Sequence, residues 1–167
     1  MKTYRLAFSA LLIAVGTVSS HLIYIPVGVA KCYPVQHTIN VLSAVLLGPW
    51  YAVLNAFAIS LLRNMLGTGS LLAFPGSMIG ALLAGIIYKR TENQLHAVLG
   101  EIFGTGILGG LVAYPVTKFV IGKDVAALFF VVPFLVSTLG GSILAYFILK
   151  QLAAHAVFKN LKLGVKK

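Results

Sequence analysis

Three polar side chains lie at the start of an apolar stretch, and their types suit the binding of a small polar ring. His37 and Asn40 are three residues apart, so they share one face of a helix. Tyr33 precedes them and adds an aromatic ring with a hydroxyl group. Imidazole, amide and phenol groups supply the donors and acceptors that a small heterocycle requires. The alternative is that the cluster only satisfies backbone groups where a helix begins.

Glu101 is the one acidic residue of the chain that lies within an apolar run. The other two, Glu92 and Asp124, lie in polar stretches. An ionisable group inside a membrane is costly and is usually functional. Glu101 is therefore either a buried functional group or an interfacial residue that faces Lys89 or Arg90, and both interpretations stay open at this point.

The spacings that catalytic and metal sites require do not occur in the chain. It contains no H-E-x-x-H, no G-x-S-x-G and no G-x-x-x-x-G-K stretch. Cys32 is its single cysteine, which excludes an internal disulfide and a cysteine metal cluster. No second histidine lies beside a carboxylate to complete a metal site. We therefore expect no catalytic residue, no metal, no cofactor and no ATP site on this chain.

The composition indicates an integral membrane protein. Of its 167 residues, 59% are hydrophobic and only 10% are charged, and the mean hydropathy is +0.98. A soluble domain of this length exposes far more charge. The apolar blocks are solid, as in membrane helices, and do not alternate as in a β-barrel. We expect an all-α protein of the cell membrane whose surroundings are the lipid bilayer.

Six apolar stretches predict six transmembrane helices in a single membrane domain, residues 1–167. Their approximate bounds are 4–25, 36–47, 49–63, 75–88, 95–118 and 126–149. The second to fourth stretches are short for a span, and we expect them to lie partly inside the bundle. The alternative for the first stretch is a signal peptide cleaved near Ser20, although its apolar run continues to Ile25.

The basic residues predict the orientation. With six spans, one side carries nine of them, namely Lys2, Arg5, Lys89, Arg90, Lys150, Lys159, Lys162, Lys166 and Lys167. The other side carries four, namely Lys31, Arg63, Lys118 and Lys123. The positive-inside rule then places the N- and C-termini in the cytoplasm. The same distribution accounts for the net charge of +10 without a nucleic-acid partner.

The segment from Arg63 to Phe74, RNMLGTGSLLAF, interrupts the apolar pattern with a charge and two glycines. Irregular backbone at membrane depth is tolerated only inside protein or beside a water-filled cavity, and such segments often mark transport sites. We expect Arg63 to cap the third span at the outer face. We expect the remainder to form a lid or cavity wall, in which LLAF packs over a ligand; an ordinary external loop is the alternative.

From Gln36 to Thr91 the sequence resembles the ThiW family, whose members are substrate-binding S components of energy-coupling-factor (ECF) vitamin transporters. The resemblance is carried by RNMLGTGSLLAFPGSMIGALLAG and, further on, by GEIFGTGILGGL. It implies an S-component-like helical bundle that imports hydroxyethylthiazole, the thiazole moiety of thiamine, for thiamine salvage. It also implies a transport subunit without enzyme activity, with a ligand site near the outer face formed by the loop after the first span and by spans four to six.

The resemblance further implies partner subunits. S components couple through an alanine-x-x-x-alanine motif in the first span to a membrane T component, which carries two cytosolic ATPase subunits. Ala10 and Ala14, in ALLIA, match that motif. Their spacing also suits close contact between helices within the chain, which is the alternative.

Together these observations predict a pocket for a small, neutral aromatic ligand with one hydroxyl group and one ring nitrogen. The candidate binding residues are Tyr33, His37, Asn40, Asn64, Glu101, Tyr114 and Ser137, with Trp50 and Phe74 as walls. Glu101 is expected to bind the ligand hydroxyl or the ring nitrogen. Two other functions stay open: an S component for another small vitamin precursor, and a stand-alone proton-coupled carrier that uses Glu101.

Overall fold

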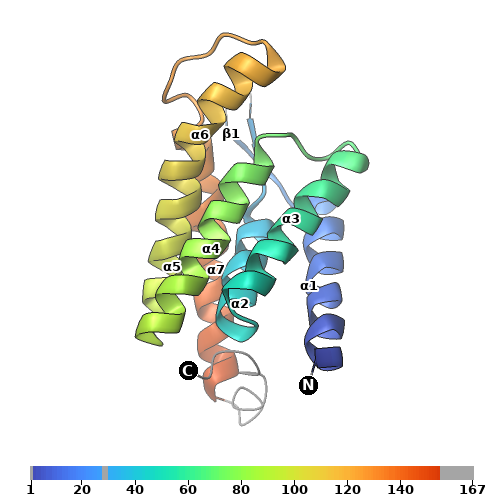
Figure 1. Cartoon of the computed structure of the whole chain (residues 1–167), viewed down its shortest axis with the longest axis vertical. Coiled ribbons are helices and arrows are strands. Elements are labelled where there is room, and N and C mark those ends of the chain that lie inside the picture. Colours follow the sequence, from blue (N-terminus) through green and yellow to red (C-terminus); the bar gives the residue numbers. More distant parts are fainter. Residues whose placement is uncertain (1, 28–29, 155–167) are drawn as a thin grey trace.

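The computed structural model describes residues 2–27 and 30–154, in which the chain forms six helices and a short β-hairpin (Figure 1). Five of the helices are α1 (Lys2–Leu22), α2 (Pro34–Leu46), α3 (Pro49–Met65), α4 (Ala73–Thr91) and α7 (Val131–Ala154). The remaining helix runs without a break through α5 (Gln94–Glu101), η1 (Ile102–Gly109), α6 (Gly110–Pro115) and η2 (Val116–Ile121). The prediction of six helices is confirmed.

The hairpin is a departure from the expected all-α fold. Its strands β1 (Ile25–Val27) and β2 (Ala30–Cys32) pair antiparallel. The first helix was expected to continue to residue 25 but ends at Leu22, because the residue before Pro26 is biased towards extended backbone. The last helix begins at Val131 rather than near residue 126, because residues 127–130 form a turn.

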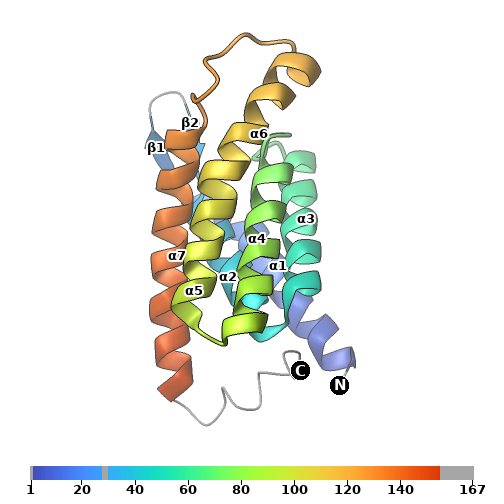
Figure 2. The same ribbon diagram turned by 60° about the vertical axis from the view of Figure 1, so that its left-hand side comes forward.

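The short helix α2 lies at the centre of the bundle. Its 13 residues rise by about 20 Å, which is less than the roughly 30 Å of a bilayer core. Every residue of α2 except Val35 is buried. Helices α1, α3, α4 and α7 pack around it, as Figures 1 and 2 show. A helix enclosed in this way can carry polar side chains without exposing them to lipid.

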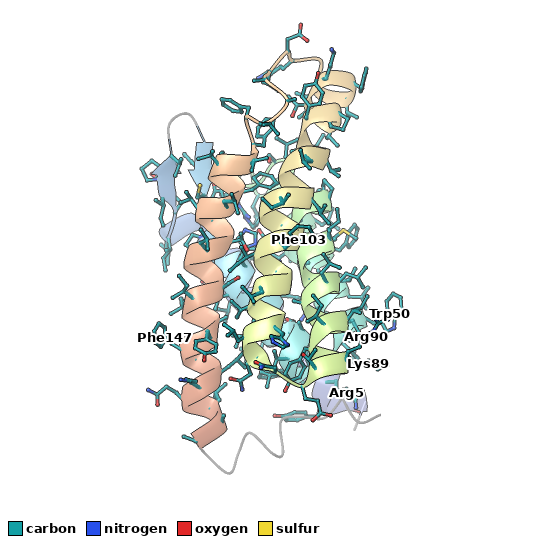
Figure 3. The ribbon with its side chains drawn as sticks, turned by 90° about the vertical axis from the view of Figure 1, so that its left-hand side faces the viewer. Arg5, Trp50, Lys89, Arg90, Phe103 and Phe147 are labelled. Atoms are coloured by element: carbon teal, nitrogen blue, oxygen red, sulfur yellow. The ribbon has the colours of Figure 1, made fainter. Side chains whose placement is uncertain are left out.

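Three helices within the described residues are long and apolar enough to cross a membrane. They are the segments Thr3–Ser20, Gln94–Ile121 and Val131–Ala154. The outer surface of the bundle carries exposed apolar side chains, among them Phe103 and Phe147 (Figure 3). Soluble proteins rarely expose so much apolar surface, so this surface suits lipid. Membrane crossing by all six helices stays a prediction.

The two ends of the bundle differ in charge and in structure. Helix α1 begins and α7 ends at one end, where Arg5, Lys89 and Arg90 also lie (Figures 1 and 3). The hairpin, the turn between α3 and α4, and η2 lie at the opposite end (Figure 1). This arrangement agrees with a cytoplasmic location of the first end. Lys159, Lys162, Lys166 and Lys167 fall outside the described residues.

Helix α1 packs on α2 and α3 with one face only. Ser9 on this face donates a hydrogen bond to Asn55, and Asn55 Nδ2 donates to Ser43 Oγ at 2.9 Å. Ala10 and Ala14 lie on the other face and are exposed. The alternative that these two alanines pack within the chain is therefore wrong.

Candidate functional site

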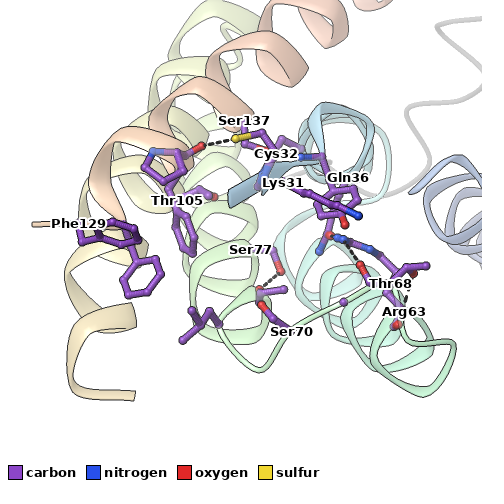
Figure 4. A pocket seen from close by; sticks show the side chains of 18 residues that line it. Lys31, Cys32, Gln36, Arg63, Thr68, Ser70, Ser77, Thr105, Phe129 and Ser137 are labelled. Atoms are coloured by element: carbon purple, nitrogen blue, oxygen red, sulfur yellow. Dashed lines mark hydrogen bonds between the residues drawn. The ribbon is translucent and has the colours of Figure 1, made fainter. Parts of the chain in front are cut away.

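A pocket of about 320 Å³ lies at the end of the bundle that carries the hairpin (Figure 4). It is formed by the hairpin, the first turn of α2, the end of α3 and the turn after it, the start of α4, η1, and the start of α7. Its polar lining includes Gln36, His37, Ser77, Thr105 and Ser137. A volume of this size, with a few polar groups among apolar ones, is typical of small-molecule sites.

Glu101 lies beneath the pocket and organises its floor. Its side chain is fully buried, and Oε1 accepts hydrogen bonds from Asn40 Nδ2 and Thr105 Oγ1, both at 2.9 Å. Oε1 also lies 3.0 Å from His37 Nδ1, a contact that is an ion pair when the imidazole is protonated. The interpretation of Glu101 as an interfacial residue is therefore wrong. Three polar side chains replace the water around Oε1, whereas Oε2 is buried without a hydrogen-bond partner among the described residues.

Gly80 on α4 makes room for this carboxyl group. A Cβ atom at position 80 would lie 2.7 Å from Glu101 Oε2 and would overlap Thr105 Oγ1. Gly104 faces Gly80 across the interface, where a Cβ atom would lie 2.7 Å from the Gly80 Cα atom. The small residues of α4 and η1 thus let the two helices approach closely, which is their usual role in membrane bundles.

The long helix changes its hydrogen-bonding pattern where it passes the pocket. Glu101 is the last residue of α5, and the π-helical segment η1 begins at Ile102 and contains Thr105. π-Helical segments are rare and frequently occur at functional sites. Here the change of pattern coincides with the residues that the long helix contributes to the pocket and its floor.

Arg63 turns inward from the end of α3 and closes one side of the pocket. Its side chain is only 2% exposed. It donates hydrogen bonds from Nη1 to Gln36 Oε1 and from Nη2 to the Thr68 carbonyl oxygen, the latter at 3.0 Å. Its guanidinium carbon lies 3.8 Å from the centroid of the Tyr33 ring, in a cation–π contact. Arg63 thus lies in the last turn of α3, as expected, but its side chain turns into the pocket wall and does not cap the helix.

The turn between α3 and α4 forms a wall of the pocket. The backbone N–H groups of Thr68 and Gly69 both donate to the Arg63 carbonyl oxygen at 2.9 Å, and Asn64 Nδ2 donates to the Ser70 carbonyl oxygen at 3.1 Å. Thr68, Gly69 and Ser70 all line the pocket. The prediction of a cavity wall is confirmed for these residues and for Leu72 and Ala73, whereas Leu71 and Phe74 of the LLAF stretch lie outside the lining.

Two contacts hold the hairpin and the residue that follows it against α7 beside the pocket. The Cys32 thiol donates to the Pro133 carbonyl oxygen at 3.1 Å, and the Tyr33 backbone N–H donates to Ser137 Oγ at 2.9 Å. Burial raises the pKa of the Cys32 thiol above its ordinary value. The start of α7 and the turn before it add an aromatic wall made of Phe129, Phe130 and Phe134.

The structure brings most of the predicted binding residues together. Tyr33, His37 and Ser137 line the pocket. Asn40 and Glu101 lie behind this lining and bond to each other. Asn64 does not line the pocket; it shapes the wall through the hydrogen bond to Ser70.

The other three predicted residues lie elsewhere. Phe74 packs on Phe57, with ring centroids 5.6 Å apart, and does not line the pocket. Tyr114 also lies outside the lining, with the Lys118 amine 5.9 Å from its ring. Trp50 is 75% exposed and lies in the half of the bundle that holds Arg90 (Figure 3).

Several lining residues were not among the predicted ones, although the sequence held a signal for three of them. Gln36 is four residues before Asn40, so both belong to one face of α2. Ser77 and Thr105 are polar residues within apolar runs, like Glu101. No group of three or more His, Cys, Asp and Glu residues that could hold a metal ion occurs among the residues that the structure describes.

Comparison with known proteins gives one match. The family model described as thiamine-precursor transporter protein (ThiW) matches residues 6–155. This range includes every element that lines the pocket. No curated protein and no solved structure matches the chain significantly.

Proposed function

The chain belongs to the ThiW family of thiamine-precursor transporters, and from this we propose that it is the substrate-binding membrane subunit of an ECF-type ABC importer that takes up hydroxyethylthiazole for thiamine salvage. The family is one of transporters and not of enzymes. The observation that carries the finer proposal is the pocket of about 320 Å³, with its aromatic wall and its hydrogen-bonding floor. ATP hydrolysis belongs, in this proposal, to partner subunits.

The chemistry of the pocket supports a small aromatic ligand with a hydroxyl group. Stacking of the ligand ring on the aromatic wall contributes on the order of 1 kcal/mol. His37 lines the pocket and has Nδ1 engaged by Glu101, which leaves Nε2 for the ligand. When the neutral ring carries its proton on Nδ1, Nε2 accepts a hydrogen bond from the ligand hydroxyl. Glu101 itself lies behind the lining, so it acts on the ligand through His37 and Thr105.

The exposed face of α1 supports the proposed contact with a T component. Ala10 and Ala14 are exposed and four residues apart, so both lie on one face of α1. Small side chains at this spacing let a second membrane helix approach closely. The T component and two ATPase subunits would then supply the energy that this chain does not itself provide.

The first alternative is a stand-alone proton-coupled carrier, which the buried contact between His37 and Glu101 favours. Uptake of labelled hydroxyethylthiazole into cells distinguishes the two. We expect uptake only when the T component and the ATPases are expressed with this chain. Uptake that persists without them and disappears when the proton gradient is removed would favour the carrier.

The second alternative is an S component for another small vitamin precursor. In the same uptake experiment, unlabelled hydroxyethylthiazole should compete fully at concentrations at which thiamine and its pyrimidine moiety do not. Stronger competition by one of those compounds would assign the pocket to that precursor instead.

A further inference from the structure

The buried guanidinium group of Arg63 has no carboxylate partner among the residues that the structure describes. The one ion pair within residues 2–27 and 30–154 joins His37 to Glu101. Arg63 bonds two neutral oxygen atoms, on Gln36 and Thr68, and its buried Nε has no hydrogen-bond partner. Because removing a charge from water is costly, a buried cation is normally paired with an anion.

The same side of the pocket holds a second cation. Lys31 on β2 lines the pocket, with its amine 4.9 Å from the centroid of the Tyr24 ring. No aspartate or glutamate belongs to the lining. The carboxyl group of Glu101 lies behind the lining, and its Oε1 already has three partners on the floor. The lining as a whole is therefore positively charged, and a cavity with such walls concentrates negative charge.

We propose that Arg63 forms an anion subsite and that the pocket also accepts a small heterocycle bearing a carboxylate or phosphate group. This inference rests on the proposed function, because it concerns the same pocket, and it extends the ligand class beyond a neutral alcohol. The planar fork of an arginine matches the oxygen atoms of either group in a bidentate fashion. Nη1 and Nη2 each carry two N–H groups and each makes one hydrogen bond among the described residues, so each has a second donor left for a ligand. Lys31 adds a second positive charge at this side.

The two ends of such a ligand fit opposite sides of the pocket. Figure 4 shows Arg63 on one side and Phe129 on the other. The anionic group would lie against Arg63 and Lys31, and the ring against the aromatic wall. His37 and Thr105 lie in the lining and would meet the polar atoms of the ring.

Equilibrium titration of the purified full chain tests the proposal with three probes: hydroxyethylthiazole, its phosphate monoester and a thiazole carboxylate. We expect all three to bind saturably. Arg63→Gln should weaken the two anionic probes at least tenfold more than it weakens hydroxyethylthiazole. Arg63→Lys should give an intermediate loss, because it keeps the charge but not the fork. The matched control is Lys123→Gln, which removes an exposed cation outside the pocket and should change none of the three affinities.

The outcomes separate this inference from the proposed function. If hydroxyethylthiazole binds and neither anionic probe does, the anion subsite is refuted and the proposed function stands. An equal loss of affinity for all three probes in Arg63→Gln would also refute the anion subsite, since Arg63 would then only support the fold. If only the anionic probes bind, the subsite stands and the neutral substrate is wrong; if no probe binds, both fail. Should Arg63→Gln not fold, Lys31→Gln gives the same comparison, with a smaller preferential loss expected.

Discussion

His37 lines the pocket and bonds the buried Glu101, so it connects the residues of the floor with a ligand in the pocket. Glu101 and Asn40 lie behind the lining, whereas the imidazole ring lies in it. A carboxylate bonded to one ring nitrogen orients the ring and determines which nitrogen is presented to a ligand. The same arrangement explains how a carboxyl group with 0% exposure can influence a ligand that it does not touch.

Substitution of His37 tests this arrangement. His37→Ala should weaken hydroxyethylthiazole binding roughly five- to tenfold, because a neutral hydrogen bond of this kind contributes about 1–1.5 kcal/mol. Glu101→Gln should give a loss in the same direction, since the ring keeps a partner but not a charged one. His96→Ala removes an exposed histidine and should leave the affinity unchanged. Titrations in which the His37 variant binds as tightly as the wild type would remove the residue from the site.

Gly80 provides a separate test of the packing around Glu101. In Gly80→Ala the new methyl group would lie 2.7 Å from Glu101 Oε2, so α4 and η1 must separate or the carboxyl group must move. We expect a loss of stability of about 1–3 kcal/mol, measured as a lower midpoint of thermal unfolding. Gly140→Ala is the matched control, because its Cβ atom would lie at an ordinary 3.5 Å from Pro34. Equal midpoints for the two variants would contradict the close approach.

Residue type alone predicted part of the site. His37, Asn40 and Glu101 could be predicted because polar groups in apolar runs stand out against their surroundings. The direction of an aromatic side chain has no comparable signal, so the sequence did not exclude Trp50 or Tyr114. Their positions depend on contacts between segments that are far apart in the chain.

At the scale of elements, the pocket depends on how the hairpin is fastened to α7. Cys32 and Tyr33 bond Pro133 and Ser137 across about a hundred positions of sequence. The six helices could be predicted from apolar runs of sufficient length. The hairpin and the π-helical segments could not, because three-residue strands and a change in backbone hydrogen bonding leave no clear hydrophobic period.

The thiol of Cys32 reports on this contact. Only the thiolate reacts with a maleimide, and burial raises the pKa of this thiol, so its thiolate fraction is below normal at any pH near neutrality. We expect the pH midpoint of the reaction rate to be higher in the folded protein than in the same chain unfolded in detergent. Cys32 is the single cysteine, so no other thiol contributes to the rate. Coinciding midpoints would show that the thiol is not buried against α7.

Helix α1 carries the proposed contact with a partner. Replacing both Ala10 and Ala14 by Leu should abolish assembly with the T component while ligand binding is retained, because these side chains are exposed and lie outside the pocket. Co-purification with the T component and ligand titration measure the two effects. Ala126→Leu, at an exposed position outside α1 and outside the pocket lining, should change neither. Assembly that survives the double substitution would place the partner on another surface.

At the scale of the whole molecule, the two ends of the bundle carry different features. Arg5, Lys89 and Arg90 lie towards one end (Figure 3), which the positive-inside rule predicts to be cytoplasmic, and the pocket lies at the other end. If the pocket end faces the outside, as the proposed function requires, this arrangement fits capture of an external ligand. The enclosed helix α2 connects the two ends, since its first turn lines the pocket and its last turn adjoins the start of α3.

The central claim is that the pocket at the hairpin end binds a small thiazole. The most direct test is to titrate the purified wild type with the ligand and to compare it with a variant whose pocket is filled by a larger side chain. Ala73 lines the pocket, so the indole of Ala73→Trp would occupy much of its volume of about 320 Å³. Ala153→Trp adds the same side chain at an exposed position of α7. We predict saturable hydroxyethylthiazole binding by the wild type and Ala153→Trp, and at least tenfold weaker binding by Ala73→Trp. Absence of saturable binding to the wild type, or equal binding by both variants, would contradict the account.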